Sequence, residues 1–256
     1  MMDLLITRMS LLCTMSPHRE GLGQLSNAAV AFKNGSVTYV GDSANAPNAK
    51  TVIDGSGCLG MPGLVDSHTH AVWAGSRSKE FAQRHAGANY TDILNAGGGI
   101  LSTVRHTRQA TTDQLRNLCK QRLAGMLARG VTTVEIKSGY GLSPEAELKS
   151  LKAAHATEDM RITRTFLGAH AIPKDYRSKR DDYVDQIITK QLPLCAPFAD
   201  SIDVYCDKGA FDLDEAIAIL QAGKEHGLKI RAHAEQVAHT GISGAAAKMG
   251  ATCVDH

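Results

Sequence analysis

The sequence predicts an α/β protein in which a small N-terminal β-sandwich-like subdomain, residues 1–60, precedes a TIM-type (β/α)8 barrel domain, residues 61–256, with six strands present. Three observations predict this arrangement. The first 60 residues hold short apolar runs separated by turn residues. The later residues alternate apolar runs with helical patterns, and histidines recur where those later runs end.

The N-terminal segment is expected to form short β-strands. Its apolar runs are LLITRMSLL, AAVAFK, SVTYVGD and TVIDGSGCLGMPG, in that order. Asn34 and Gly35 separate the second run from the third. An Asn-Gly pair between alternating runs favours a tight hairpin, because both central residues of a type I′ turn need positive φ.

Six apolar runs after residue 60 are predicted to be parallel strands. They are LVDSHTH, GVTTVEIK, MRITRTFLGAH, SIDVYCDK, LKIRAHAE and ATCVDH. Helical patterns separate them, Ser143-Pro144 is typical of a helix start, and Gly130, Gly227 and Gly250 stand where helices should end. Strand and helix in alternation indicate right-handed βαβ units. Because a barrel closes at eight strands, we expect the front part of a longer protein, with an open six-stranded sheet as the alternative.

Composition argues against several classes of function. The formal net charge is +2, no basic run is present and 5% of residues are aromatic, so a nucleic-acid surface has little support. No stretch approaches the roughly 20 apolar residues that cross a bilayer. Six cysteines without a CxxC pair indicate reduced thiols. We therefore expect a cytoplasmic enzyme that acts on a small molecule, with no nucleic-acid or membrane partner.

Histidine is the residue type that indicates chemistry. His68 and His70 are two positions apart on one predicted strand, so their side chains point to the same face and can share an ion. His170, His233 and His256 end later strands, and barrel active sites lie at those ends. Each could be a core histidine bonded to a backbone carbonyl, but that explanation is poor for the set.

Longer motifs resemble a known family. The segments HTHAVWAGSRSKEF, NYTDILNAGGGI, EIKSGYGL, FLGAHAIP, DVYCDKGAF and HAEQ occur in this order. They resemble the amidohydrolase superfamily and, within it, the imidazolonepropionase family of histidine degradation. The resemblance implies hydrolysis of the cyclic amide of 4-imidazolone-5-propanoate to N-formimidoyl-L-glutamate.

The same resemblance implies roles for individual residues. One zinc or iron ion would be held by His68, His70, His233 and a strand-eight aspartate that would lie beyond His256. Such a set leaves an open position for water, as catalytic metal sites do. The implied catalytic groups are His256 and His170, and the implied substrate contacts are Arg77 for the propionate, Tyr90, Tyr140, His170 and Gln236.

Some features leave alternatives open. Many family members have an acidic pair where this chain has Glu235-Gln236, and an amide cannot act as a base, so Gln236 is assigned to binding. Arg77 could instead pair with Glu80 on the surface. Lys137 lies on the second barrel strand, which favours one metal ion and a structural or substrate-side lysine. Rival functions are a purine or pyrimidine aminohydrolase and an inactive metal-binding fragment. A homodimer remains open.

Overall fold

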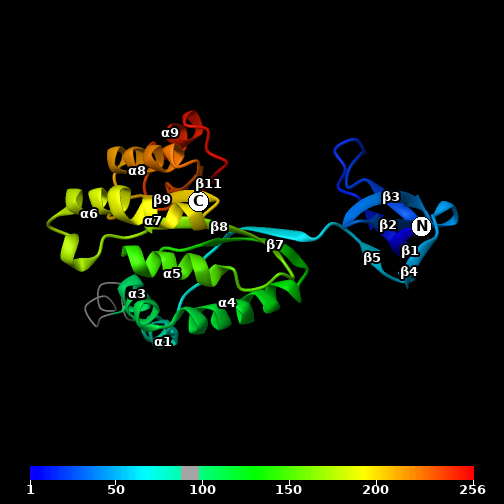
Figure 1. Ribbon diagram of the computed structural model, residues 1–256, viewed down its shortest axis with the longest axis horizontal. Coiled ribbons are helices and arrows are strands. Elements are labelled where there is room, and N and C mark those ends of the chain that lie inside the picture. The colour runs from blue at the N-terminus through cyan, green and yellow to red at the C-terminus, as the bar shows by residue number, and fades with distance from the viewer. Residues whose placement is uncertain (88–97) are drawn as a thin grey trace. The chain divides into compact units, whose positions relative to one another are not determined.

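The computed structural model describes residues 1–87 and 98–256. The chain divides into two compact units, Met1–Gly63 and Leu64–His256, which we call the N-terminal unit and the C-terminal unit (Figure 1). No helix in the described ranges is long and apolar enough to span a membrane.

The N-terminal unit is a five-stranded mixed sheet. Its strands are β1 (Met2–Cys13), β2 (Gln24–Lys33), β3 (Ser36–Asp42), β4 (Ala49–Asp54) and β5 (Leu59–Gly60). They are arranged in the order β3-β2-β1-β4, with β5 also paired to β1. Asn34 and Gly35 join β2 to its antiparallel neighbour β3 with φ values of 52° and 74°, so the predicted hairpin is confirmed.

The C-terminal unit contains the six strands that the apolar runs predict. They are β6 (Leu64–Thr69), β7 (Val131–Lys137), β8 (Arg161–Ala169), β9 (Ser201–Cys206), β10 (Lys229–Ala234) and β11 (Cys253–Asp255). All pair in parallel and in sequential order, from β6 at one edge to β11 at the other. This is the order of a β/α barrel, so the predicted fold class is confirmed.

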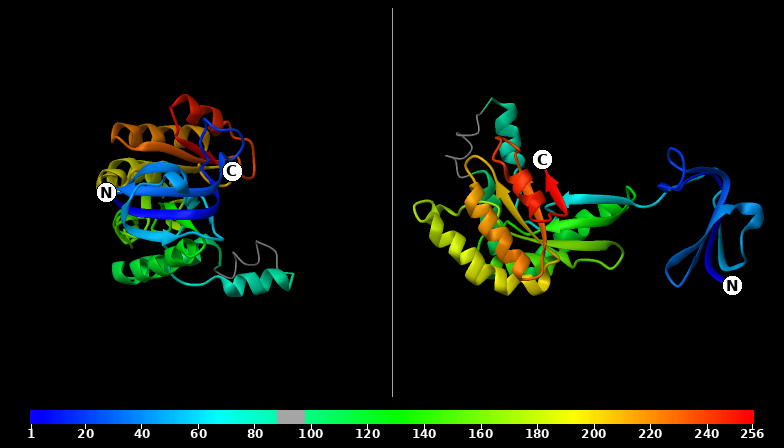
Figure 2. Two further views of the ribbon diagram at one scale, coloured as in Figure 1. Left: turned by 90° about the vertical axis from the view of Figure 1, so that its right-hand side faces the viewer. Right: turned by 90° about the horizontal axis from the view of Figure 1, so that it is seen from above.

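Helices cover one face of this sheet (Figure 2). Those on the strands are α4 (Thr112–Leu127), α5 (Pro144–Ala154), α6 (Arg180–Gln186), α7 (Leu192–Cys195), α8 (Leu213–Glu225) and α9 (Ile242–Lys248). Two further helices, α1 (Ser78–His85) and α3 (Ile100–Gln109), lie in the segment between β6 and α4. Capping boxes at Thr111 and Asp212 start α4 and α8. The sequence pattern predicts one helix where α6 and α7 flank a π-helical stretch, Ile187–Gln191. Pro193, which lacks an N–H, follows that stretch.

The two faces of the parallel sheet differ in chemistry because side chains alternate along a strand. Toward the helices, Ile202 and Val204 of β9 join a core that includes Phe166. The intervening residue Asp203 is fully buried, as is Lys137 on β7. The face away from the helices therefore carries buried charged side chains, and the candidate site lies at the carboxyl end of its strands.

Candidate metal centre

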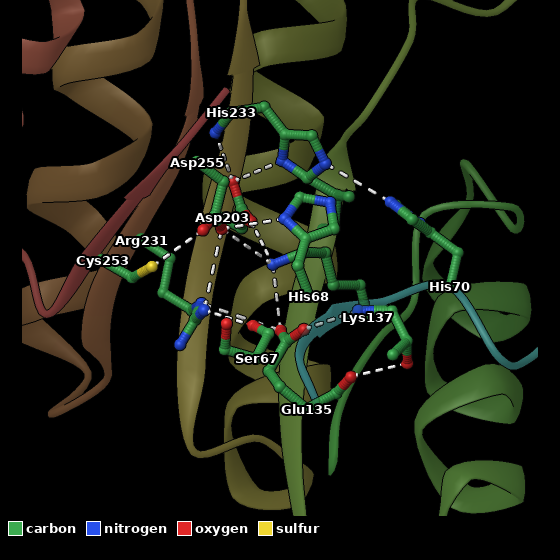
Figure 3. A network of polar contacts seen from close by, with 12 residues as sticks. Ser67, His68, His70, Glu135, Lys137, Asp203, Arg231, His233, Cys253 and Asp255 are labelled. Carbon is green, nitrogen blue, oxygen red and sulfur yellow. Dashed lines mark hydrogen bonds and ion pairs between the residues drawn. The ribbon is translucent and has the colours of Figure 1, made fainter. Parts of the chain in front are cut away.

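Three predicted metal ligands lie together at the carboxyl ends of two strands. His68 is on β6, His70 follows that strand directly, and His233 is near the end of β10. Each offers a ring nitrogen, and these three nitrogens lie within 4.8 Å of one another. His70 Nε2 is 3.3 Å from His233 Nε2 (Figure 3). Residues 163 positions apart in the sequence thus meet because their strands share a sheet.

Two further predicted histidines surround these three rings. The ring of His170, which follows β8, stacks on that of His70 with centroids 4.8 Å apart. The ring of His256 lies 5.0 Å from that of His68 and 5.3 Å from that of His233. A cavity of about 270 Å³ is lined by His68, His70, His170, Tyr205, His233, Gln236 and His256. Its volume is near the lower end of the range for small-molecule sites.

Burial favours the neutral form of three of these imidazoles, those of His68, His70 and His170. It lowers the pKa of His70 to about 2, and the neighbouring histidines and Lys137 contribute. Burial also lowers the pKa of His170 to about 4, and it lowers the pKa of His68, with a further contribution from Lys137. A neutral imidazole has a free nitrogen lone pair, which is the form that binds a metal ion.

The donor set fits a divalent cation. The Nδ1 atom of His70 is buried and has no hydrogen-bond partner in the described part of the chain. The Nε2 atoms of His70 and His233 face each other at 3.3 Å. Two nitrogen lone pairs at that distance repel each other, so a proton or a cation between them would stabilise the arrangement. Three imidazoles around an open cavity correspond to a catalytic metal set.

Asp203 fixes the orientation of His233. Its Oδ1 atom lies 3.0 Å from His233 Nδ1 and also accepts a bond from the His233 backbone N–H. A carboxylate only accepts, so Nδ1 of His233 must be the protonated nitrogen and Nε2 is left free. Burial raises the pKa of Asp203, but His233 and Lys137 outweigh this and leave the pKa below its usual value. Asp203 is not among the residues predicted from the sequence, although its place on the inward face of β9 was an available signal.

Tyr140 and His170 are linked through one loop. The Gly139 carbonyl lies 2.9 Å from Nδ1 of His170 and accepts its proton, and the Tyr140 ring lies 5.2 Å from the His170 ring. The backbone N–H groups of Gly139, Gly141 and Leu142 all donate to the buried carboxylate of Glu147 on α5. Sequence reasoning missed Glu147, which holds the loop that carries Tyr140.

The predicted substrate contacts do not all line the cavity. Arg77 precedes α1 and binds Glu80 with Nε and Nη2 at 2.8 and 2.7 Å, the partner that the sequence analysis left open. Its charge still opposes the burial that raises the pKa of Tyr140. Gln236 lines the cavity, whereas Tyr90 lies outside the described residues.

Curated relatives of the chain are imidazolonepropionases. That of Shewanella putrefaciens is 45% identical over 255 residues, which cover 96% of this chain and 62% of the relative. That of Caulobacter vibrioides is 45% identical over 252 residues, covering 96% and 63%. The chain thus spans about three fifths of the length of these relatives. The family resemblance inferred from the motifs is confirmed. No protein-family model matches the chain.

Three solved structures with a similar fold are hydrolases. A triazine hydrolase from Arthrobacter aurescens matches with a TM-score of 0.62 at 18% identity, covering 93% of this chain and 54% of that one. An atrazine chlorohydrolase from strain TC1 of that species, complexed with zinc, gives 0.59 at 18% identity, covering 96% and 55%. The ochratoxinase of A. niger gives 0.54 at 17% identity, covering 99% and 60%. At such identities the likeness establishes the fold.

Proposed function

We propose that this chain, a homologue of the imidazolonepropionases, belongs to an enzyme that hydrolyses the cyclic amide of 4-imidazolone-5-propanoate to N-formimidoyl-L-glutamate in histidine degradation. The observation that carries the proposal is the 45% identity over 96% of the chain. The histidines that line the cavity supply groups suited to the reaction. The six free cysteines support a cytoplasmic location.

One zinc or iron ion is the proposed cofactor, with His68, His70 and His233 as its protein ligands. Imidazole nitrogen suits both metals. Support comes from the three convergent nitrogens and from the zinc in the structurally similar atrazine chlorohydrolase. When bound, such an ion polarises a carbonyl oxygen and makes a coordinated water more acidic.

His170 and His256 are the proposed proton-transfer groups. Because the Gly139 carbonyl accepts the Nδ1 proton of His170, the Nε2 lone pair of that ring is free to accept a proton or a hydrogen bond. His256 lines the same cavity beside His68 and His233. Both rings thus border the space in which a water and the ring carbonyl would meet.

Substrate recognition is assigned to Arg77, Tyr90, Tyr140, His170 and Gln236. The guanidinium of Arg77 has five N–H donors, so its bonds to Glu80 leave donors for a propionate. Gln236 lines the cavity, and its side-chain amide can both donate to and accept from an imidazolone ring. Tyr140 is partly buried, with its ring beside that of His170, and its hydroxyl can donate a hydrogen bond to a substrate.

Hydrolysis assays test the proposal. The chain, treated with chelator and then loaded with zinc or ferrous iron, is supplied with 4-imidazolone-5-propanoate, and N-formimidoyl-L-glutamate is measured. We expect product formation that depends on metal and is abolished by His70→Ala. Metal binding without product would instead support the inactive metal-binding fragment.

A second candidate is a purine or pyrimidine aminohydrolase. It is favoured by the fold shared with hydrolases named for triazine and atrazine, which are nitrogen heterocycles. Ammonia release from nucleobases by the metal-loaded chain, without cleavage of the imidazolone, would select this alternative. Arg77 would then have no substrate carboxylate to bind.

A further inference from the structure

A buried lysine lies behind the candidate metal centre. The Lys137 side chain has no exposed surface, and its Nζ donates to Asp203 Oδ2 at 2.7 Å and to Glu135 Oε1 at 3.0 Å (Figure 3). Asp255 Oδ2 is 3.7 Å away. We call Lys137, Glu135, Asp203, Arg231 and Asp255 the Lys137 cluster. Four strands supply it: β7, β9, β10 and β11.

Two carboxylates join Lys137 to two of the candidate metal ligands. Asp203 binds Lys137 with one oxygen and His233 Nδ1 with the other. Asp255 Oδ2 lies 2.9 Å from His68 Nδ1. Asp203 only accepts, so it fixes a proton on His233 Nδ1 and leaves Nε2 of that ring free. The contact between Asp255 and His68 is an ion pair without a hydrogen bond, and the negative charge of Asp255 favours a proton on the Nδ1 atom of His68.

Other members of the Lys137 cluster hold the backbone that carries the remaining ligand. Glu135 accepts bonds from the backbone N–H of Thr69 at 3.3 Å and, with its own carbonyl, from the Thr69 hydroxyl at 2.6 Å. Thr69 separates His68 from His70. Arg231 donates to the carbonyl of Ser67 at 2.6 Å. The end of β6 is thus held from both sides of His68.

We infer that Lys137 is a positioning residue for the metal centre: through Asp203 and Asp255 it holds His233 and His68 with Nδ1 protonated and Nε2 free, and through Glu135 it orients the segment that bears His70. The inference rests on the proposed function only in taking these histidines as metal ligands. A lysine that served folding alone could be replaced by an apolar side chain at little cost in metal affinity.

The tautomers of the histidines test the inference on the unaltered chain. Nitrogen-15 NMR of the chelator-treated protein at pH 8 distinguishes protonated Nδ1 from protonated Nε2. We expect the Nδ1–H form for both His233 and His68. A predominant Nε2–H form of either ring would overturn the inference, whether or not any variant folds.

Metal affinity in Lys137→Met supplies the second test. Competition with a chromophoric chelator measures the Kd for zinc and cobalt without any turnover. We expect the Kd to rise roughly 10- to 100-fold, as it does when the outer partners of metal ligands are removed. Lys149→Met is the matched control, because Lys149 donates to backbone carbonyls of Arg108 and Ala110. Its Kd should stay within about twofold of the parent value.

Folding and function are separated by two further comparisons. If Lys137→Met does not fold, the double variant Lys137→Met/Glu135→Gln removes one charge of each sign, and its zinc Kd is measured in its place. An unchanged zinc Kd in a folded variant overturns the inference about Lys137. It does not contradict the proposed hydrolysis of the imidazolone. A parent chain that binds zinc tightly but never cleaves the imidazolone contradicts the proposed function alone.

Discussion

Arg77 shows how one side chain separates the candidate functions. It binds Glu80, whose other oxygen accepts the backbone N–H of Gly99. If the substrate carries a carboxylate, Arg77→Met should raise KM for 4-imidazolone-5-propanoate roughly 10- to 100-fold with little change in kcat, because a hydrogen bond to a charged group contributes about 1.5–3 kcal/mol. Steady-state kinetics measure both constants.

The control for this variant lies on the same helix. Arg84→Met removes another charged side chain of α1 and should leave KM unchanged. A substrate analogue without the propionate should be cleaved equally by the parent and by Arg77→Met. An unaltered KM of Arg77→Met for the anionic substrate would contradict the assigned role and favour an aminohydrolase.

His170 predicts how the stability of the metal-free chain depends on pH. Its pKa falls from 6.5 to about 4 on folding, so between these pH values the unfolded state binds more protons than the folded state. Unfolding free energy should therefore decrease as pH falls from 6.5 to 4, by at most about 3 kcal/mol from this residue. Urea titrations across this window, after chelation, measure it.

Replacing His170 checks the origin of that pH dependence. His170→Gln should reduce the slope between pH 4 and 6.5, and the slope that remains belongs to His70 and His68, whose pKa values burial also lowers. His18→Gln, at an exposed position of the N-terminal unit, should leave the slope unchanged. Equal slopes in the parent chain and in His170→Gln would show that other groups cause the loss of stability.

At the scale of elements, the loop between β7 and α5 depends on a single carboxylate. Glu147 accepts three backbone N–H groups from Gly139, Gly141 and Leu142 at 2.7–2.8 Å. A glutamine has one oxygen and cannot accept all three in this geometry. Glu147→Gln should lower the unfolding free energy by roughly 1–3 kcal/mol, the cost of an unsatisfied buried donor. It should also raise KM, because Tyr140 lies in this loop.

Glu145→Gln is the matched control, since that carboxyl is exposed on the same helix and should have little effect. Gly141→Ala gives independent evidence: a Cβ there would lie 2.5 Å from backbone atoms of Ala146 and Glu147, so the loop would have to shift. If Glu147→Gln matched the parent in both stability and KM, the loop would have another determinant.

Local patterns predicted the elements better than they predicted the contacts between them. The hairpin at Asn34 and the six parallel strands follow from alternation and from turn residues. The π-helical stretch before Pro193 was not anticipated, because the apolar period continues through it. The period of apolar residues indicates which face of a helix is buried. It does not distinguish the backbone hydrogen-bond pattern of an α-helix from that of a π-helix.

The site was partly predictable for the same reason. His68 and His233 could be selected because strand ends meet at one edge of a parallel sheet. Lys137 was noted from its place on a strand, but its ion pair with Asp203 could not be predicted, because a charged residue within a strand gives no local indication of a partner 66 positions away. Only the assembled sheet pairs them.

At the scale of the whole molecule, the six-stranded sheet ends on β6 and β11, each paired on one side only within the described residues. Strand β6 also exposes 46% of Leu64 and 66% of Val65. Unpaired edges with apolar side chains promote association. We expect the 256-residue chain to self-associate with rising concentration, as measured by light scattering and size-exclusion chromatography.

A charge placed on the edge tests whether β6 causes that association. Val65→Lys should shift the chain toward monomer, because a lysine on an edge strand opposes pairing with another chain. Val237→Lys places the same charge at a position that is similarly exposed, at 69%, but lies outside the strands, and should not change association. Equal effects of both variants would assign association to net charge instead. A monodisperse parent chain that melts cooperatively would contradict the predicted self-association.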